Sequence, residues 1–311
     1  MPKQAPTART LPANLTLLSL RNADGSETLG VKSGSQVIDV RQAASILKIA
    51  SPLTLDQLLQ EDRGADLVQL IEAVRTSDKA NAAVNPEADI TYGRLFSKPG
   101  KIICVGLNYR KHAEEVGMPI PQTPILFSKF NNALAPHNAT IALPPYEVSY
   151  KIDYEVELVM VIGRTTRNVS EDEALHHVAG YCTGNDLSAR DLQLERGSQW
   201  LQGKTLDGFA PIGPYFVSAD QIENPNNLRL ETTVNGELRQ SSNTSDFIFN
   251  CQQVISYISK LWTLEPGDLI FTGTPQGVIG GLPVDRQIWL KAGDKVVCSV
   301  EKLGKLAVTL G

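Results

Sequence analysis

Short apolar runs broken by turns dominate the chain, and helical patterns are few. Near the N-terminus, residues 15–20, 28–33 and 36–40 are strand-like runs, separated by Asn-Ala-Asp-Gly and Ser-Gly turns. Two helical segments follow them. Thr54 is a capping residue before apolar positions, and residues 65–74 repeat leucine, isoleucine and valine at helical spacing. This pattern predicts a small α+β unit.

The pattern changes after residues 95–101, where proline, glycine and charge mark a boundary. Many strands with few helices then indicate a β-rich sandwich or barrel-like roll. The expected strands are 102–105, 153–162, 178–187, 228–234, 269–272, 295–300 and 306–310, and the expected helices are 109–116, 170–177 and 246–260. We therefore expect a small α+β domain at residues 1–97, beginning with a disordered leader, and a β-rich domain at residues 98–311.

Composition and charge narrow the class of protein. The chain has 311 residues, of which 42% are hydrophobic and 20% charged, as in ordinary globular proteins. The net charge of −5 argues against nucleic acid as a partner, because that requires a clustered basic face. No apolar run is long enough to span a membrane, and no signal peptide is apparent. Four widely spaced cysteines indicate buried free thiols in a cytoplasmic protein.

Two acids share one face of the longest expected strand. Residues two apart in a strand point to the same side, so Glu155 and Glu157 project together while Tyr154, Val156 and Leu158 point away. Adjacent carboxylates repel each other unless water or a cation lies between them. The apolar run that follows favours a buried strand, so the pair indicates a metal site. The alternative is a polar strand face.

A third acid follows the next strand-like run. Asp186 comes after Thr183-Gly-Asn, where a loop can approach a cavity. With Glu155 and Glu157 it would complete a set of three oxygen ligands, which suits Mg²⁺, Mn²⁺ or Ca²⁺. Three protein ligands leave positions open for substrate and water. The alternative for Asp186 is an acid that caps a helix or a turn.

Histidine is scarce, and one of the four has an acidic neighbour at helical spacing. In a helix, His112 and Glu115 lie three residues apart on one face. A carboxylate beside an imidazole orients the ring and raises its basicity, which makes a general-base pair. Such pairs are also frequent on protein surfaces. His176 and His177 follow an acidic helix, where a charge role at the helix C-terminus is the simpler interpretation.

Two glycine-flanked loops carry further candidates. Lys204 lies in Gln-Gly-Lys-Thr, where it is either a solvated charge or a contact for an anion. Thr274 lies in Phe-Thr-Gly-Thr-Pro-Gln-Gly, directly after an expected strand. Such loops bind carboxylates through backbone N–H groups, but they are also ordinary turns.

In this order, the motifs resemble those of the fumarylacetoacetate hydrolase family. The matching segments are VGLNYRKHAEE, FSKFNNAL, DYEVELVMVIGR, GNDLSARDLQ, GKTLDGFAPIGP, the region around PGDLIFTGTPQGV, and LKAGDKV. The resemblance covers about residues 100 to 311. It implies a mixed β-sandwich roll for the larger domain, and the domain before it resembles the N-terminal domain of longer bacterial members.

The resemblance implies a metal centre and a catalytic pair. It assigns Glu155, Glu157 and Asp186 as ligands, usually of Mg²⁺ or Mn²⁺, with Ca²⁺ as a further oxygen-binding cation. It assigns His112 and Glu115 as the catalytic dyad of the smaller family members. A homodimer is also what the family implies.

Further positions follow from the same resemblance. Lys204 matches a catalytic lysine that contacts substrate or stabilises an oxyanion. Arg190 and Gln193 match substrate-binding or supporting positions, and Thr274 matches a residue near the substrate carboxylate. Larger eukaryotic-type members have an aspartate ligand seven residues before the catalytic histidine. Val105 stands there in this chain, so water is expected in place of a fourth protein ligand.

The implied reaction is metal-dependent hydrolysis of a C–C bond in an acylpyruvate, a 2,4-dioxo acid of the fumarylpyruvate or fumarylacetoacetate kind. His112, held by Glu115, would activate the water that attacks the 4-carbonyl, and Lys204 would stabilise the oxyanion. The same cavity suits two alternatives, decarboxylation of oxaloacetate and isomerisation of 2-hydroxyhepta-2,4-diene-1,7-dioate. A non-catalytic binding protein is a third, which the intact histidine, glutamate and lysine disfavour.

Overall fold

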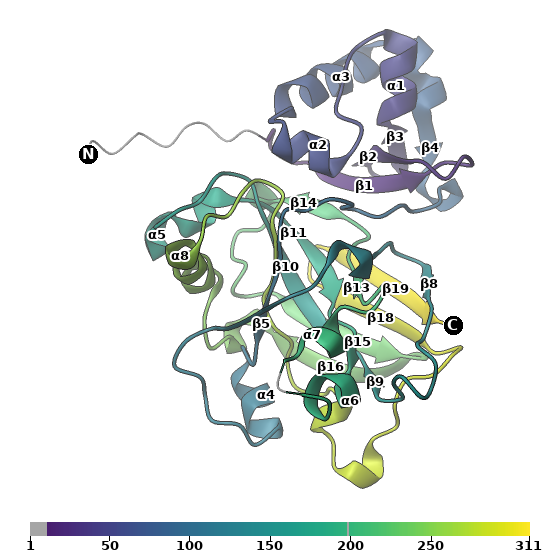
Figure 1. Ribbon diagram of the computed structural model, residues 1–311. Coiled ribbons are helices and arrows are strands. Elements are labelled where there is room, and N and C mark those ends of the chain that lie inside the picture. Colours follow the sequence, from purple (N-terminus) through teal and green to yellow (C-terminus); the bar gives the residue numbers. More distant parts are fainter. Residues whose placement is uncertain (1–10, 198) are drawn as a thin grey trace.

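The structure, a computed structural model, describes residues 11–197 and 199–311. It is a strand-rich α+β fold, as the sequence pattern predicts, with a small N-terminal unit packed on a larger body (Figure 1). Most of the leader expected at the start of the chain falls on residues 1–10, which lie outside the described residues.

The N-terminal unit is an antiparallel sheet with helices on one side (Figure 1). Its strands are β1 (Thr16–Arg21), β2 (Glu27–Ser33), β3 (Gln36–Asp39) and β4 (Val84–Pro86), and its helices are α1 (Val40–Leu47), α2 (Leu55–Gln60) and α3 (Gly64–Thr76). Thr54 caps α2 as expected, by accepting a hydrogen bond from the Gln57 backbone N–H at 3.1 Å. Helix α1 was not expected from the sequence. The strand expected at 36–40 ends one residue early because Asp39 caps this helix.

The body contains two larger sheets and several short elements. The strands that it adds to the first sheet are β5 (Ile102–Gly106), β6 (Ile125–Ser128), β10 (Val156–Ile162), β11 (Val178–Asn185), β14 (Phe216–Ser218) and β17 (Leu269–Phe271). The second sheet contains β8 (Ala139–Ile141), β15 (Arg229–Val234), β16 (Glu237–Asn243), β18 (Lys295–Val300) and β19 (Gly304–Leu310). Two short pairs are β9 (Ile152–Asp153) with β12 (Ser188–Ala189), and β7 (Leu134–Ala135) with β13 (Ala210–Pro211).

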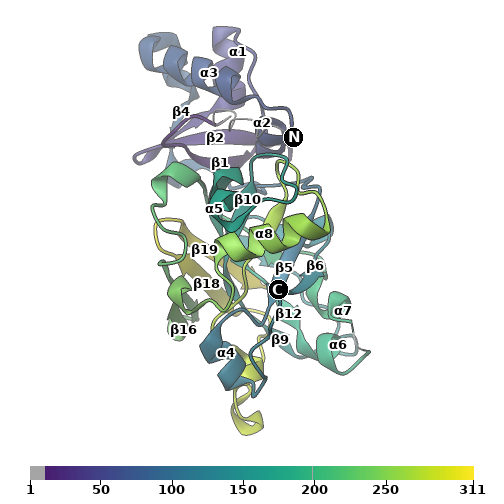
Figure 2. The ribbon, with the colours of Figure 1, turned by 90° about the vertical axis from the view of Figure 1, so that its left-hand side faces the viewer.

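The helices of the body are short, apart from α8. They are α4 (Arg110–Glu115), α5 (Glu171–Ala174), α6 (Arg190–Leu194), α7 (Leu201–Lys204) and α8 (Cys251–Leu261). The 3₁₀ turns of the N-terminal unit are η1 (Asp78–Ala83) and η2 (Glu87–Asp89). Those of the body are η3 (Asn131–Ala133), η4 (Leu175–His177), η5 (Ala219–Gln221), η6 (Thr244–Asp246), η7 (Ile279–Gly281) and η8 (Val284–Arg286). Helices α5 and α8 lie side by side on the outside of the body (Figure 2).

The first sheet has ten strands in the order β4-β3-β2-β1-β14-β11-β10-β17-β5-β6. Strand β1 pairs with β14, so the sheet of the N-terminal unit continues into the body. At its centre, β10 runs antiparallel to β11, with Glu157 opposite Gly184. The second sheet has five strands, and neither sheet closes on itself within the described residues. The fold is therefore an open sandwich-like roll.

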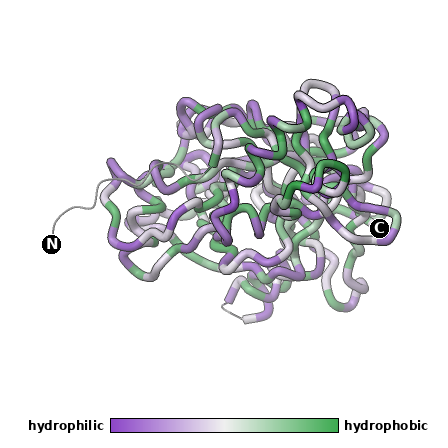
Figure 3. The backbone as a smooth tube through the Cα atoms, turned by 90° about the horizontal axis from the view of Figure 1, so that it is seen from above, coloured by the Kyte–Doolittle hydropathy of each residue, from purple (hydrophilic) through white to green (hydrophobic). Residues whose placement is uncertain are grey.

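Two large hydrophobic clusters, and a small third one of Leu18, Leu20 and Val37, fill the described part of the protein. One large cluster packs β10, β15, β18 and α8 against each other, through residues such as Val156, Leu230 and Ile255. The other large cluster combines Leu67 of the N-terminal unit with Phe271 of the body. Because this core crosses residue 97, the two parts pack as one body, and the expected domain boundary stays a prediction. Apolar and polar stretches alternate rapidly along the backbone (Figure 3), as short strands require.

Several expected helices differ from the observed ones. The helix expected at 246–260 begins only at Cys251, because Asn250 and Gln253 form a capping box. The helix expected at 170–177 is a single α-helical turn, α5, followed by η4. His176 of η4 pairs with Glu173 of α5 at 3.2 Å on the exposed surface. The short helices α6 and α7 were not expected, and α7 carries Lys204 at its end.

Two simpler expectations concern the cysteines and the membrane. All four cysteines are buried and free, as the sequence predicts. None of the helices in the described part of the chain is long and apolar enough to cross a membrane.

Candidate active site

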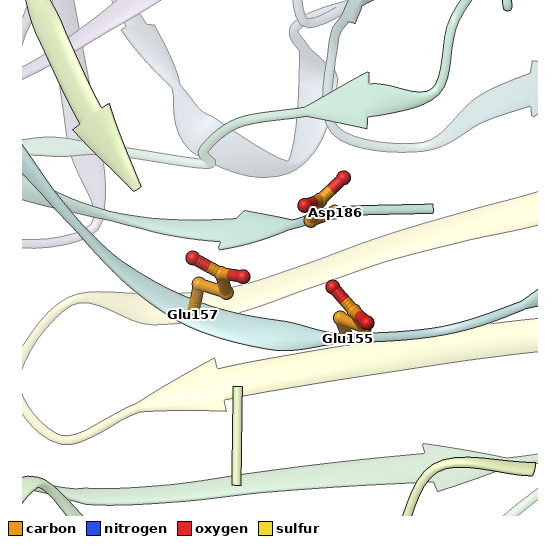
Figure 4. Close-up of side chains that lie close together, drawn as sticks. All are labelled: Glu155, Glu157 and Asp186. Atoms are coloured by element: carbon orange, nitrogen blue, oxygen red, sulfur yellow. The ribbon is translucent and has the colours of Figure 1, made fainter. Parts of the chain in front are cut away.

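Glu155 and Glu157 lie close together (Figure 4). The strand expected at 153–162 begins only at Val156, so Glu155 immediately precedes β10 and Glu157 lies within it. Tyr154, Val156 and Leu158, the alternating residues, pack into the hydrophobic core on the other side. The two glutamates are nevertheless buried, with only 5% and 2% of their surface exposed. A solvated strand face is therefore excluded as the reason for this pair.

Asp186 joins the two glutamates from the neighbouring strand. It follows the end of β11, and its backbone N–H donates to the Glu155 carbonyl at 2.9 Å. The Asn185 side chain in turn accepts a hydrogen bond from the Glu155 N–H at 3.0 Å. These contacts bring one carboxylate oxygen of each acid within 4.8 Å of the others (Figure 4). Asp186 is fully buried, unlike an ordinary turn acid.

Three cationic side chains surround this carboxylate cluster, defined as Glu155, Glu157 and Asp186. The Lys204 ammonium donates to Glu155 at 2.7 Å and to Asp186 at 3.0 Å. Lys129 pairs with the second oxygen of Asp186 and also donates to the Leu187 carbonyl at 3.2 Å. Arg190 pairs at 2.7 Å with the Glu155 oxygen that Lys204 does not contact.

The cations compensate the acids unequally. Burial opposes ionisation of Glu155, but Lys204 and Arg190 outweigh it and lower the pKa of this carboxyl to about 2. For Glu157 the balance is reversed. Burial, Asp186 and Glu155 raise the pKa of Glu157 well above its usual range. Its hydrogen bond is a 2.7 Å contact from the Gly273 N–H, and no cation of the described residues forms an ion pair with it.

The donor set fits a hard divalent cation. Three buried carboxylates converge, and the negative charge of Glu157 lacks a partner that a cation would supply. Carboxylate oxygens carry two lone pairs each, so Lys129 and Lys204 do not exhaust the acceptor capacity of Asp186. Oxygen-only ligands favour Mg²⁺, Mn²⁺ or Ca²⁺ over zinc. Val105 lines the same cavity and offers no further ligand.

His112 and Glu115 form the second part of the site, which we call the dyad. Both lie on α4, as the helical spacing predicts, and Nδ1 of His112 is 3.1 Å from a Glu115 oxygen. The other Glu115 oxygen accepts the Gly277 N–H at 2.8 Å. Nearby, a Cβ on Gly281 would lie 2.5 Å from the Glu115 carboxyl. The loop at residues 277–281 therefore fixes the position of Glu115.

The dyad and two members of the carboxylate cluster, Glu155 and Glu157, line one cavity of about 460 Å³. Among its lining residues are His112, Glu115, Glu155, Glu157, Arg190, Gln193, Lys204 and Thr274. His112 lies near enough to Glu155 for its charge to help lower the pKa of that carboxyl. A cavity of this size, with polar groups on one side, is typical of a small-molecule site.

The three expected substrate-binding residues are mostly occupied by protein partners. Arg190 donates to Asp153 at 2.9 Å and to the Gln193 side-chain oxygen at 3.0 Å, in addition to its pair with Glu155. The Thr274 hydroxyl donates to the Val156 carbonyl at 3.0 Å and accepts from Gln240 at 3.0 Å. Thr274 thus ties its loop to β10, whatever it contacts in a substrate.

Two residues of the site were missed at the sequence level. Lys129 is buried against Asp186, and its position within the segment FSKFNNAL was the available signal. Asp153 is fully buried and accepts N–H groups of Ile279 and Gly280 at 2.9 Å each. It lies two residues before Glu155, so the strand periodicity that joined Glu155 to Glu157 applied to it as well.

A family model described as the C-terminal domain of fumarylacetoacetate (FAA) hydrolase matches residues 101–310. The chain belongs to the fumarylacetoacetate hydrolase family. A fumarylacetoacetate hydrolase domain-containing protein 2 homolog of Dictyostelium discoideum is 55% identical over 218 residues, which cover 67% of this chain and 70% of that protein. The mitochondrial oxaloacetate tautomerase FAHD2B of Bos taurus is 40% identical over 279 residues, covering 89% and 85%.

Solved structures support the same conclusion. A fumarylacetoacetate hydrolase from Exiguobacterium antarcticum shares 31% identity at a TM-score of 0.77, and covers 95% of this chain and 99% of its own. A fumarylpyruvate hydrolase from Pseudomonas aeruginosa, solved with Mn²⁺ and pyruvate, shares 35% identity at a TM-score of 0.61, covering 68% and 88%. A 2-hydroxyhepta-2,4-diene-1,7-dioate isomerase of Mycobacterium marinum is also similar, with 28% identity, a TM-score of 0.70 and coverage of 95% and 98%. The family is therefore enzymatic, with hydrolase, isomerase and tautomerase members.

Proposed function

We propose that the protein is a Mg²⁺- or Mn²⁺-dependent tautomerase of a short 2-oxo acid of the oxaloacetate type. The observation that carries this proposal is the placement of the dyad, Glu155 and Glu157 around one cavity, with Asp186 beside the two glutamates. Interconversion of the keto and enol forms requires one proton-transfer group and stabilisation of an enolate, and this site offers both. The tautomerase name of a relative that matches 89% of the chain gives the substrate class.

Glu155, Glu157 and Asp186 would hold the metal. When bound, the metal supplies Lewis-acid stabilisation of the negative charge that develops on the 2-oxo oxygen. Around it, Lys129 and Lys204 form ion pairs with Asp186 and orient its carboxyl group. Arg190 orients the Glu155 carboxyl group, because its guanidinium group forms ion pairs with both Glu155 and Asp153.

His112 is the proton-transfer group in this proposal. Its Nδ1 faces Glu115, which leaves Nε2 as the ring nitrogen for the substrate. Glu115 fixes the imidazole orientation and stabilises the protonated ring that forms when His112 takes a proton from C3 of the substrate. The Gly277 N–H holds Glu115 in place for this task.

Hydrolysis of an acylpyruvate is the second candidate, and the cavity volume favours it. A four-carbon acid would leave part of the roughly 460 Å³ empty, while a longer 2,4-dioxo acid would fill more of it. The engagement of Lys204 weighs against hydrolysis. Two of its three ammonium donors already contact Glu155 and Asp186, so at most one remains for an oxyanion.

Substrate-binding residues, oligomeric state and location in the cell complete the proposal. Arg190, Gln193 and Thr274 bind the substrate on the polar side of the cavity, with Arg190 and Thr274 also acting through their protein partners. The protein works in the cytoplasm as a homodimer on a small-molecule 2-oxo acid. Size-exclusion chromatography with light scattering tests the dimer.

The test of function compares three substrates with the same metal-loaded protein. The decay of the oxaloacetate enol is followed by ultraviolet absorbance, pyruvate release from an acylpyruvate by a coupled dehydrogenase, and oxaloacetate decarboxylation by evolved carbon dioxide. The proposal expects enol decay that depends on metal and on His112, with little pyruvate or carbon dioxide released. If metal-dependent pyruvate release from the acylpyruvate is observed without enol decay, the tautomerase proposal is wrong and the protein is an acylpyruvate hydrolase.

A further inference from the structure

One wall of the active-site cavity is aromatic and continues from the carboxylate cluster. Phe127 lies under Lys204, with the ammonium 5.1 Å from the ring centroid. Trp200 packs edge-to-face on Phe127, with ring centroids 5.4 Å apart and an interplanar angle of 69°. Ile125 and Met118 also line the cavity. We call Phe127, Trp200, Ile125 and Met118 the aromatic wall.

Gly106 makes room for this wall at the end of β5. A Cβ at this position would lie 2.4 Å and 2.9 Å from two atoms of the Trp200 ring and 3.5 Å from Ile125. The indole ring therefore lies directly against the backbone of the strand that leads into the dyad. No residue other than glycine fits at position 106 without moving the Trp200 ring.

The cationic side chains of Arg190 and Lys204 at the cavity are already paired with carboxylates. Among the described residues that line the cavity, these two are the cationic groups besides His112. The aromatic wall offers apolar surface and aromatic faces to a substituent that extends away from the carboxylate cluster. Such a surface stabilises an apolar or aromatic group and does not compensate a second carboxylate.

We propose that the protein also tautomerises arylpyruvates, 2-oxo acids that carry an aromatic ring on C3, of which phenylpyruvate is the simplest. This inference rests on the proposed function, because the same 2-oxo acid end must lie at the carboxylate cluster. The ring lies on the aromatic wall, against Trp200 and Phe127. Oxaloacetate, with a carboxylate in that position, leaves the wall uncovered.

The reaction needs no co-reactant. In the keto form, His112 takes the proton from C3 as the C3–H bond breaks, and the electron pair becomes the C2–C3 double bond. The carbonyl π pair moves onto the oxygen at C2, which accepts the proton from the protonated His112 ring, so that the enol forms and His112 returns to its starting state. The reverse sequence returns the keto form, and atoms and electrons balance in both directions.

The experiment measures kcat/KM for ketonisation of the enols of phenylpyruvate and oxaloacetate with the Mn²⁺-loaded full chain. Trp200→Ala should lower kcat/KM for phenylpyruvate about 10- to 100-fold more than for oxaloacetate, because burial of the ring is lost. Phe127→Leu should act in the same direction and keeps an apolar residue in the wall. Trp262→Ala is the matched control, since Trp262 lies outside this cavity and is half-exposed; it should leave both substrates unaffected.

A binding measurement separates this inference from the proposed function. Quenching of tryptophan fluorescence by phenylpyruvate should be saturable in the chain and weakened by Trp200→Ala. If oxaloacetate is turned over but phenylpyruvate neither binds nor reacts, the aromatic wall does not bind substrate and this inference is wrong. Equal losses for both substrates in Trp200→Ala and Phe127→Leu would also overturn it. If no enol is turned over but phenylpyruvate binding depends on Trp200, the proposed tautomerase function is wrong. Binding of an aromatic ring at the aromatic wall would then be retained.

Discussion

The two parts of the active site differ in how the fold supports them. The carboxylate cluster lies where two paired strands, β10 and β11, begin and end within the core, and the side chains of Asp186 and Glu155 there are 0% and 7% exposed. The dyad lies on a six-residue helix, with the side chains of His112 and Glu115 10% and 18% exposed. Strand pairing fixes the cluster, whereas one loop contact fixes the dyad. Metal binding and proton transfer should therefore be separable by mutation.

The largest effect is expected for Glu157→Gln, which removes one carboxylate charge and keeps the size of the side chain. We expect Mn²⁺ binding to be lost by calorimetry, and activity to fall by at least about 10³-fold, since a bound metal contributes several kcal/mol of charge stabilisation. Glu231→Gln, on the exposed face of β15, is the control. Full metal affinity in Glu157→Gln would contradict the assignment of this ligand.

His112→Asn should break the dyad and leave the cluster intact. Loss of a general acid–base group lowers kcat by about 10²- to 10⁴-fold. Mn²⁺ affinity should stay within a few-fold of the unmodified protein, because His112 contacts Glu115 and not the carboxylate cluster. If metal affinity and kcat fall together, the two parts of the site are not independent.

A smaller effect is expected from the loop that positions Glu115. Gly281→Ala places a Cβ 2.5 Å from the Glu115 carboxyl and must displace it. A misplacement on the order of 1 Å costs up to about 10²-fold in rate, so kcat should fall while Mn²⁺ affinity is kept. Gly280→Ala is the neighbouring control, because its Cβ would lie 3.3 Å from the nearest atom, on Arg190. Equal rates for the two variants would argue against this positioning role.

The smallest effect concerns pH. Burial, Asp186 and Glu155 raise the pKa of Glu157 well above its usual range, so its protonated form stabilises the metal-free protein at low pH. This contribution is lost as the pH rises through the raised pKa, and metal binding needs the deprotonated carboxylate. The increase in Tm caused by Mn²⁺ should therefore be larger at about pH 8 than at about pH 5. Scanning calorimetry at both pH values measures this, and an equal increase would show that Glu157 does not control it.

The sequence predicted the elements whose pattern is local. A period of two placed Glu155, the residue before β10, beside Glu157 within it, and the spacing of three in α4 placed His112 beside Glu115. The capping residue Thr54 started α2 where expected. These features depend on neighbours within a few residues, which the sequence contains directly.

Features that depend on distant residues were missed or misplaced. The segment FSKFNNAL draws attention to Lys129, but local spacing does not show that it pairs with Asp186, 57 residues away. Asp153 gains its role from Arg190 and from the loop at residues 277–281. The short helices α6 and α7 are too brief for a periodic pattern, and residues packed around them determine where they form.

The sequence by itself therefore determined which residue types stand on which face of their own element, and hence the candidate ligands and the candidate base. Only the tertiary structure decided that Asp186 lies beside the two glutamates and that two of the Lys204 ammonium donors contact the carboxylate cluster. It also decided that the Trp200 ring packs against Gly106. The physical reason is that periodicity fixes directions within one element, whereas burial, charge compensation and cavity shape depend on elements that pairing and packing bring together.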